Sequence, residues 1–149
     1  MRPLIFLLAF VLLSSCAKRK ARLQAEEDDA IIAQYISDNG LNAIKSESGL
    51  YYVIDSVGTG VSPVNTDNVT VAYKGYFTNG EVFDESSSAG ITCNLQGVIR
   101  GWTEGITYFN EGGSGILLIP SHLAYGKSGS GSIPGNTVLI FDVDLIEVQ

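Results

Sequence analysis

Apolar and polar residues alternate along several short segments of this chain, and such alternation predicts β-strands with one buried face. The pattern is clearest in TVLIFDVDLIEV (137–148), where apolar residues at every second position lie opposite Asp142 and Asp144. VTVAYKGYF (69–77) alternates in the same way, and Asn79 with Gly80 after it is typical of a hairpin turn. Further strands are predicted at LYYVIDSV (50–57), EVFDE (81–85) and SGILLIP (114–120).

A helical spacing interrupts these strands at VIRGWTEG (98–105). Trp102 is followed by Ile106 and Phe109, four and seven positions on, which places the three side chains on one face of a short helix. About five strands and one short helix predict an α+β fold in which an antiparallel sheet curls its apolar face around the helix. Trp102 is the only tryptophan; in the first turn of that helix, one side of its ring can pack inward while the other forms the floor of a pocket.

A second helix is predicted before the first strand. IIAQYI (31–36) carries an apolar stripe, EEDD (26–29) suits a helix amino terminus, and Asn39 with Gly40 is a typical helix end. The stripe can pack on the domain, pair with another copy of the chain, or contact a partner. Packing on the domain is the commonest of these outcomes.

The first residues have the pattern of an export signal. Arg2 precedes ten consecutive apolar residues, Leu4 to Leu13, and Ser14, Ser15 and Cys16 follow. This apolar stretch has the length found in signal peptides and is too short to span a bilayer. LSSC (13–16) resembles a bacterial lipobox, which predicts that residues 1–15 are removed and that Cys16 carries a lipid. The alternative is an ordinary secretory signal with an incidental cysteine.

Composition narrows the chemistry. The chain has 149 residues, 45% of them hydrophobic, which suits one domain plus an appendage. Its formal net charge of −7 argues against nucleic acid as a partner. His122 is the only histidine and no G-x-S-x-G motif is present, so a serine-hydrolase site is not predicted. One histidine and one cysteine beyond Cys16 are too few for a zinc or iron site, so we predict neither a metal nor a cofactor.

Aromatic and aliphatic side chains are the remaining candidates for a site. A cavity lined with such groups, a few hydroxyls and one carboxylate, Asp84, binds an apolar group without attacking it. The other candidates are Tyr73, Phe83, Val98, Ile99, Trp102, Tyr125, Ile133 and Phe141.

Four strings of this chain resemble the signature blocks of the FKBP-type peptidyl-prolyl cis–trans isomerases, the macrolide-binding immunophilins. They occur in the family's order, as VTVAYKGYFTNGEVFDES (69–86), VIRGWTEG (98–105), IPSHLAYG (119–126) and IPGNTVLIFDVDLIEV (133–148). The resemblance covers about Gly49 to Gln149 and implies a proline pocket between a five-stranded antiparallel sheet and a short helix. The catalytic residues that it implies are Tyr73, Phe83, Asp84, Tyr125 and Phe141. The substrate-binding residues that it implies are Ile91, Val98, Ile99, Ile133 and Trp102, the last being the pocket floor in the family.

The sequence departs from the family's pattern at one wall of this pocket. Ile91 and Cys93 stand where aromatic residues are frequent, and no Lys or Arg lies between Asp84 and Gly97 to pair with the aspartate. These departures bear on the affinity for macrolide inhibitors and on the catalytic rate more than on the fold.

Together these features predict three parts: a lipoprotein signal peptide at 1–15, a lipidated tether with a helical spacer at 16–45, and an isomerase domain at 46–149. The implied function is isomerisation of prolyl bonds in exported polypeptides without a nucleophile. The implied location is a bacterial cell envelope, with the domain lipid-anchored and facing the periplasm. Two alternatives remain: an FKBP-like module that binds or chaperones proline-containing segments with weak or no activity, and a structural lipoprotein whose helix near 26–38 mediates assembly.

Overall fold

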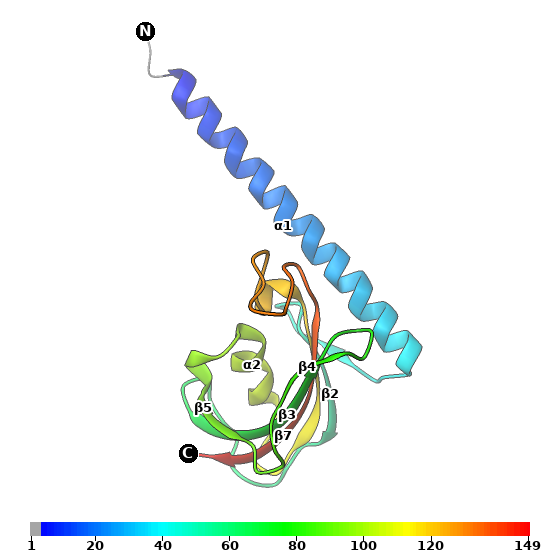
Figure 1. Ribbon diagram of the computed structural model, residues 1–149. Helices are drawn as coiled ribbons and strands as arrows, with labels where there is room; N and C mark the ends of the chain where they lie inside the picture. Colours follow the sequence, from blue (N-terminus) through cyan, green and yellow to red (C-terminus); the bar gives the residue numbers. More distant parts are fainter. Residues whose placement is uncertain (1–3) are drawn as a thin grey trace.

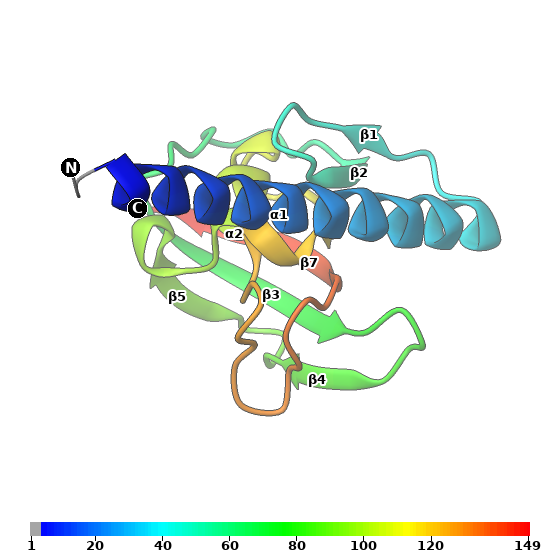
Figure 2. The ribbon, with the colours of Figure 1, turned by 90° about the horizontal axis from the view of Figure 1, so that it is seen from above.

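A computed structural model describes residues 4–149, with side chains from residue 16 onward (Figure 1). A long helix, α1 (Leu4–Asn39), runs along one side of a twisted antiparallel sheet, and a short helix, α2 (Arg100–Gly105), lies on the other side (Figures 1 and 2). The predicted signal peptide at 1–15 falls partly outside the described residues, and only the backbone of its remainder is described. Within the described part of the chain, no helix is both long and apolar enough to cross a bilayer.

The sheet has seven strands, which pair antiparallel in the order β1-β2-β6-β7-β3-β4, with β5 also paired to β3. The strands are β1 (Ile44–Lys45), β2 (Tyr51–Ser56), β3 (Asn68–Tyr76), β4 (Val82–Glu85), β5 (Ile91–Asn94), β6 (Ser114–Ile119) and β7 (Leu139–Val148). Three short 3-10 helices connect them, namely η1 (Leu95–Gly97), η2 (Ile106–Tyr108) and η3 (Ser121–Leu123).

The predicted α+β fold is confirmed, with seven strands instead of about five. The additional strands are short, two residues in β1 and four in β5, and segments of that length show no clear alternation. The predicted hairpin turn is also confirmed. The Gly80 N–H donates to the Phe77 carbonyl oxygen at 2.9 Å, and Gly80 has a φ of 86°, which glycine adopts without strain.

The main core lies between the sheet and α2. Alternate side chains of β3, β6 and β7 point to this face because successive residues of a strand face opposite sides. They surround Trp102, Ile106 and Phe109, which the sequence pattern places on one helical face and which are all buried.

Two glycines allow α2 to lie directly on β6. A Cβ on Gly101 would lie 2.5 Å from Ile119 Cγ2, and one on Gly105 would lie 2.7 Å from Leu117 Cδ2. Any larger residue at either position would push the helix away from the sheet, and Trp102 would move with it.

The opposite face of the sheet forms a second core beneath α1. Ile32 is fully buried there, in one cluster with Leu118 of β6 and Ile140 of β7. Next to it, Asp29 accepts a hydrogen bond from the Tyr51 hydroxyl at 2.9 Å and pairs with Lys45 Nζ at 2.5 Å. Of the three uses considered for the apolar stripe, the structure shows packing on the domain.

The predicted start of this helix is wrong, whereas its end is confirmed. The carboxylates of EEDD (26–29) lie inside α1, which begins at Leu4. The helix continues through them because CAKRKARLQA (16–25) consists almost entirely of strong helix formers. It ends at Asn39, and Gly40 follows with a φ of 61°.

Candidate active site

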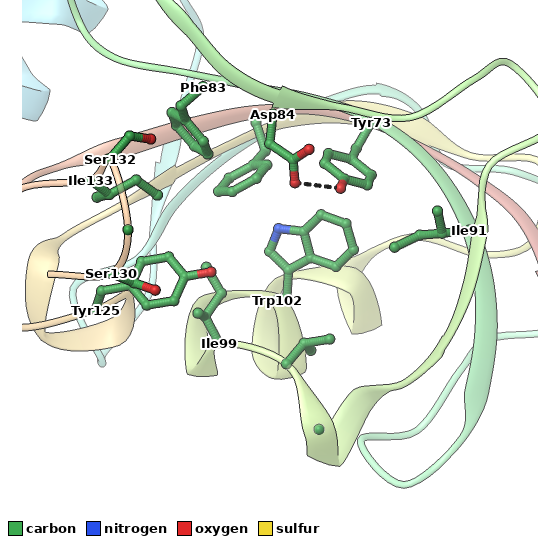
Figure 3. Close-up of a pocket in the computed structure, with 14 residues that line it drawn as sticks. Tyr73, Phe83, Asp84, Ile91, Ile99, Trp102, Tyr125, Ser130, Ser132 and Ile133 are labelled. Carbon is green, nitrogen blue, oxygen red and sulfur yellow. Dashed lines mark hydrogen bonds between the residues drawn. The ribbon is translucent and has the colours of Figure 1, made fainter.

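A cavity of about 570 Å³ opens between α2, the inner face of the sheet and the loop that follows η3 (Figure 3). Most of its lining is aromatic or aliphatic. The lining residues are Tyr73, Phe83, Asp84, Ile91, Gly97, Val98, Ile99, Trp102, Tyr125, Ser130, Gly131, Ser132, Ile133 and Phe141.

The structure brings all ten predicted pocket residues together around this one cavity. Their individual roles in catalysis and binding stay predictions. Four further lining residues, Gly97 and the run from Ser130 to Ser132, are not among the predicted pocket residues, because they are small and not apolar. The run lies in a tight turn, in which the backbone N–H groups of Ser130 and Ile133 each donate to the other's carbonyl oxygen at 2.9 Å.

Aromatic rings meet edge to face in the inner wall of the cavity. The Trp102 ring centroid lies 5.0 Å from that of Tyr73 and 5.4 Å from that of Phe141, with interplanar angles of 86° and 81°. Phe83 completes the wall, 5.5 Å from Phe141 at 83°. Each such pair is worth about 0.5–1.5 kcal/mol beyond the burial of its area. The rings therefore hold one another in place without a ligand.

Gly75 provides the space for two of these rings. It lies opposite Phe141 in the β3–β7 ladder. A Cβ on Gly75 would lie 2.7 Å from the Phe83 ring and 2.8 Å from the Phe141 ring. The inner wall of the cavity thus depends on a residue without a side chain in β3.

Asp84 and Tyr73 form the main polar pair of the cavity. The Tyr73 hydroxyl donates to Asp84 Oδ2 at 2.7 Å (Figure 3). The Tyr73 backbone is also fixed, because its N–H donates to Ser86 Oγ at 2.9 Å and its carbonyl oxygen accepts from the Ser86 N–H at 3.0 Å. Asp84 has no Lys or Arg between it and Gly97 in the sequence, and in the structure its hydrogen-bond partner is the Tyr73 hydroxyl.

The environment of Tyr73 also changes its titration. Burial, reinforced by the hydrogen bond to Asp84, raises the pKa of Tyr73 from near 10 to about 12. A phenol whose pKa is higher in the folded state stabilises that state fully below its unfolded pKa. This contribution is then lost as the pH rises from about 10 to about 12.

We therefore expect Tyr73→Phe to destabilise the protein at pH 8 and to lose most of this effect near pH 12. The free energy of unfolding, measured in urea for both proteins between pH 8 and pH 12, checks this. The gap between wild type and variant should narrow steadily above pH 10. A gap of constant size would show that the hydroxyl proton is not held more tightly in the folded state.

Two hydrogen-bond donors face the apolar interior. Trp102 is only 4% exposed, and its Nε1 is the one buried side-chain polar atom without a partner in the part of the chain that the structure describes. Figure 3 shows the indole on the cavity floor, between Tyr125 and Ile91. Tyr125 is 40% exposed, and its hydroxyl points into the cavity. The site can therefore hold an apolar ring, and the exposed Tyr125 hydroxyl can donate a hydrogen bond to a group beside it, whereas Trp102 Nε1 is buried beneath the surface of the cavity floor.

Other reactive side chains lie away from this cavity. The His122 Nε2 is 3.0 Å from the carbonyl oxygen of Ser48, on the outside of η3. Cys93 does not line the cavity, and burial raises the pKa of its thiol. Among the described residues, no group of three or more His, Cys, Asp or Glu side chains is arranged to hold a metal ion.

Comparisons with known proteins agree with this geometry. The profile of the FKBP-type peptidyl-prolyl cis-trans isomerase family matches residues 60–146. The FKBP-type peptidyl-prolyl cis-trans isomerase FkpA of Aeromonas hydrophila is 41% identical over 141 residues, which are 92% of this chain and 53% of the relative. FkpA of Escherichia coli K12 is 38% identical over 141 residues, covering 91% of this chain and 52% of the relative. The crystal structure of FkpA from Escherichia coli matches with a TM-score of 0.74 at 32% identity, covering 100% of this chain and 74% of that one.

The chain therefore belongs to the FKBP-type peptidyl-prolyl cis-trans isomerase family, as its four sequence blocks predict. It spans about half the length of the curated relatives described above.

Proposed function

We propose that this protein catalyses the cis–trans isomerisation of Xaa-Pro peptide bonds. The observation that carries the proposal is the cavity in a member of this family: its aromatic inner wall is already formed, and Trp102 is its floor. Its size suits a prolyl ring together with the residues on either side. Proline-containing polypeptides are accordingly the substrates we propose, with macrolide inhibitors as competitors for the same cavity.

The cavity lowers the barrier by favouring a less polar state of the peptide bond. Rotation about that bond crosses about 18–20 kcal/mol, because the twisted amide loses its resonance. The twisted amide is also less polar than the planar one. Transfer from water into an apolar cavity therefore costs the twisted amide less free energy than it costs the planar amide. Burial between Trp102, Phe83 and Phe141 removes water from the prolyl bond, and this favours the transition state over the ground state. No covalent intermediate is needed.

Orientation of the bound substrate accounts for the rest of the rate acceleration. The Tyr125 hydroxyl points into the cavity and can donate a hydrogen bond to a substrate carbonyl oxygen. That bond holds one flank of the proline while the other rotates. The Tyr73–Asp84 pair acts at the opposite wall, where its 2.7 Å hydrogen bond keeps both side chains in one arrangement.

A protease-coupled isomerisation assay on Xaa-Pro peptides, with the full-length protein in detergent, tests the proposal. The uncatalysed reaction takes about 10–100 s, so catalytic amounts of protein should shorten it visibly. The same peptides are titrated by calorimetry. If the peptides bind but do not isomerise faster, the protein is the binding module described above and not an enzyme. If they neither bind nor isomerise faster, both interpretations are contradicted.

We also propose that Cys16 carries a lipid and holds the domain at the periplasmic side of a bacterial envelope membrane. The LSSC motif supports this proposal, as does the exposure of Cys16 on α1. The amino-terminal part of α1 extends beyond the sheet (Figure 1). Cys16 is not among the residues that line the cavity, so an anchor there does not fill it.

In bacterial cells, we expect full-length protein to fractionate with membranes and Cys16→Ser to lose the lipid. Mass spectrometry of the intact protein should show a diacylglyceryl-modified Cys16 as the first residue. An unmodified cysteine in a soluble wild-type protein would contradict the lipoprotein interpretation and favour the ordinary secretory signal.

A further inference from the structure

Asp28 of α1 is the one charged residue that is buried in the described part of the chain, at 0% exposure. It does not line the cavity, and the proposed mechanism does not use it. Neither of the two ion pairs among the described residues includes it. A buried carboxylate without a counter-ion persists only where hydrogen bonds compensate for its lost hydration.

Three donors converge on this carboxylate. Gln24 Nε2 donates to Oδ1 at 2.8 Å, and the backbone N–H and hydroxyl of Ser121 donate to Oδ2 at 2.8 Å and 2.6 Å. Ser121 is the first residue of η3, and the residue before it, Pro120, makes no side-chain cap. Asp28 therefore caps η3 from a helix 93 residues earlier in the chain.

Ser121 in turn fixes the backbone on both sides of Tyr125. Its carbonyl oxygen accepts hydrogen bonds from the N–H groups of Ala124 at 3.0 Å and Gly126 at 2.8 Å. The Gly126 carbonyl oxygen accepts from the Asn136 N–H at 2.8 Å, which closes the base of the loop that lines the cavity. Since Tyr125 is 40% exposed, its position depends on this backbone more than on side-chain packing.

We infer that Asp28 is a positioning residue for Tyr125. Through Ser121 it fixes the two residues that flank Tyr125, and so it holds the Tyr125 hydroxyl over the cavity. Helix α1 is then part of the framework of the site as well as a spacer. The kinetic side of this inference rests on the proposed isomerase function, whereas the link between α1 and the Tyr125 backbone does not.

The kinetic test is a double-mutant cycle in full-length protein. Asp28→Ala should lower kcat/KM by no more than Tyr125→Phe does, which is about tenfold or less for one hydrogen bond. In the Tyr125→Phe background, Asp28→Ala should have no further effect, because both changes remove the same interaction. Glu27→Gln, at the exposed neighbouring position, is the control and should leave kcat/KM unchanged.

Amide hydrogen exchange gives a second readout that does not depend on activity. In Asp28→Ala, the Ala124 and Gly126 amides should exchange at least about tenfold faster, as expected when local opening becomes easier, while the amides of β7 keep their wild-type rates. If Asp28→Ala does not fold, Ser121→Ala replaces it, since this variant loses the hydroxyl and keeps the backbone donor.

Two results would overturn the inference: additive kinetic losses in the cycle, or faster exchange throughout the sheet. Either would mean that Asp28 supports the fold as a whole. An inactive wild type would instead refute the proposed function, and the exchange of Ala124 and Gly126 would still decide the positioning role.

Discussion

Phe141→Ala should lower kcat/KM by about 30- to 100-fold, whereas Tyr125→Phe should lower it by about tenfold or less. Burial against a phenylalanine side chain is worth roughly 2–3 kcal/mol, and each 1.36 kcal/mol corresponds to a factor of about ten in rate. One neutral hydrogen bond contributes only about 0.5–1.5 kcal/mol. If the protein accelerates isomerisation by about three to four powers of ten, it must lower the barrier by roughly 4–5.5 kcal/mol, and most of that must then come from the apolar wall.

The measurement is kcat/KM for both variants at a temperature where circular dichroism shows them folded. Phe141 is 5% exposed, and its replacement by alanine also costs stability, about 3–5 kcal/mol. Phe141→Leu, which keeps more of the apolar volume, should fall between wild type and Phe141→Ala. Leu139→Ala is the matched control, because Leu139 is equally buried on β7 without lining the cavity. It should lose stability while keeping kcat/KM.

The opposite ranking would refute a mechanism based on removal of water. If Tyr125→Phe abolished activity while Phe141→Ala left it nearly intact, the hydrogen bond to the substrate would be the main source of catalysis.

Ile32→Ala should lower the free energy of unfolding by about 2–5 kcal/mol, the range for truncating a fully buried isoleucine. Ile32 has 0% exposure beneath α1, in one cluster with Val53, Leu118 and Ile140. The neighbouring Ile31 is 37% exposed and is the matched control. We expect Ile31→Ala to change stability by about 0.5 kcal/mol or less.

Urea unfolding followed by circular dichroism measures both variants. A single transition, shifted only by Ile32→Ala, would show that α1 and the sheet unfold together. Equal effects of the two substitutions would mean that the helix does not pack on the sheet in solution.

The parts of the fold that were predictable are those in which local periodicity and burial agree. In β7, Leu139 and Phe141 face the cavity side while Asp142 faces away. The alternation of apolar and polar residues along this strand predicts that arrangement directly. Ile140 breaks the pattern, because it faces the second side and is nevertheless buried. Its burial depends on α1, which no pattern within β7 can indicate.

Long-range partners explain what was missed. Glu27 and Asp28 are adjacent acidic residues, and nothing in their neighbourhood shows that one is exposed and the other buried. The difference depends on Ser121, 93 residues away. At the cavity, bulky residue types and the family resemblance indicate the aromatic wall. Ser130 and Gly131 contribute through the path of a turn, which their side chains do not signal.

The single tryptophan makes the cavity observable in solution without a label. Trp102 is the only tryptophan of the chain, so all of the protein's indole fluorescence originates at the cavity floor. Its ring is held edge to face by Tyr73 and Phe141, and its Nε1 has no partner among the described residues. A peptide that enters the cavity must therefore change the polarity around an otherwise fixed fluorophore. The emission spectrum of Trp102 therefore reports the fraction of cavities that hold a peptide. Unmodified peptides can be ranked by dissociation constant in this way before any turnover is measured.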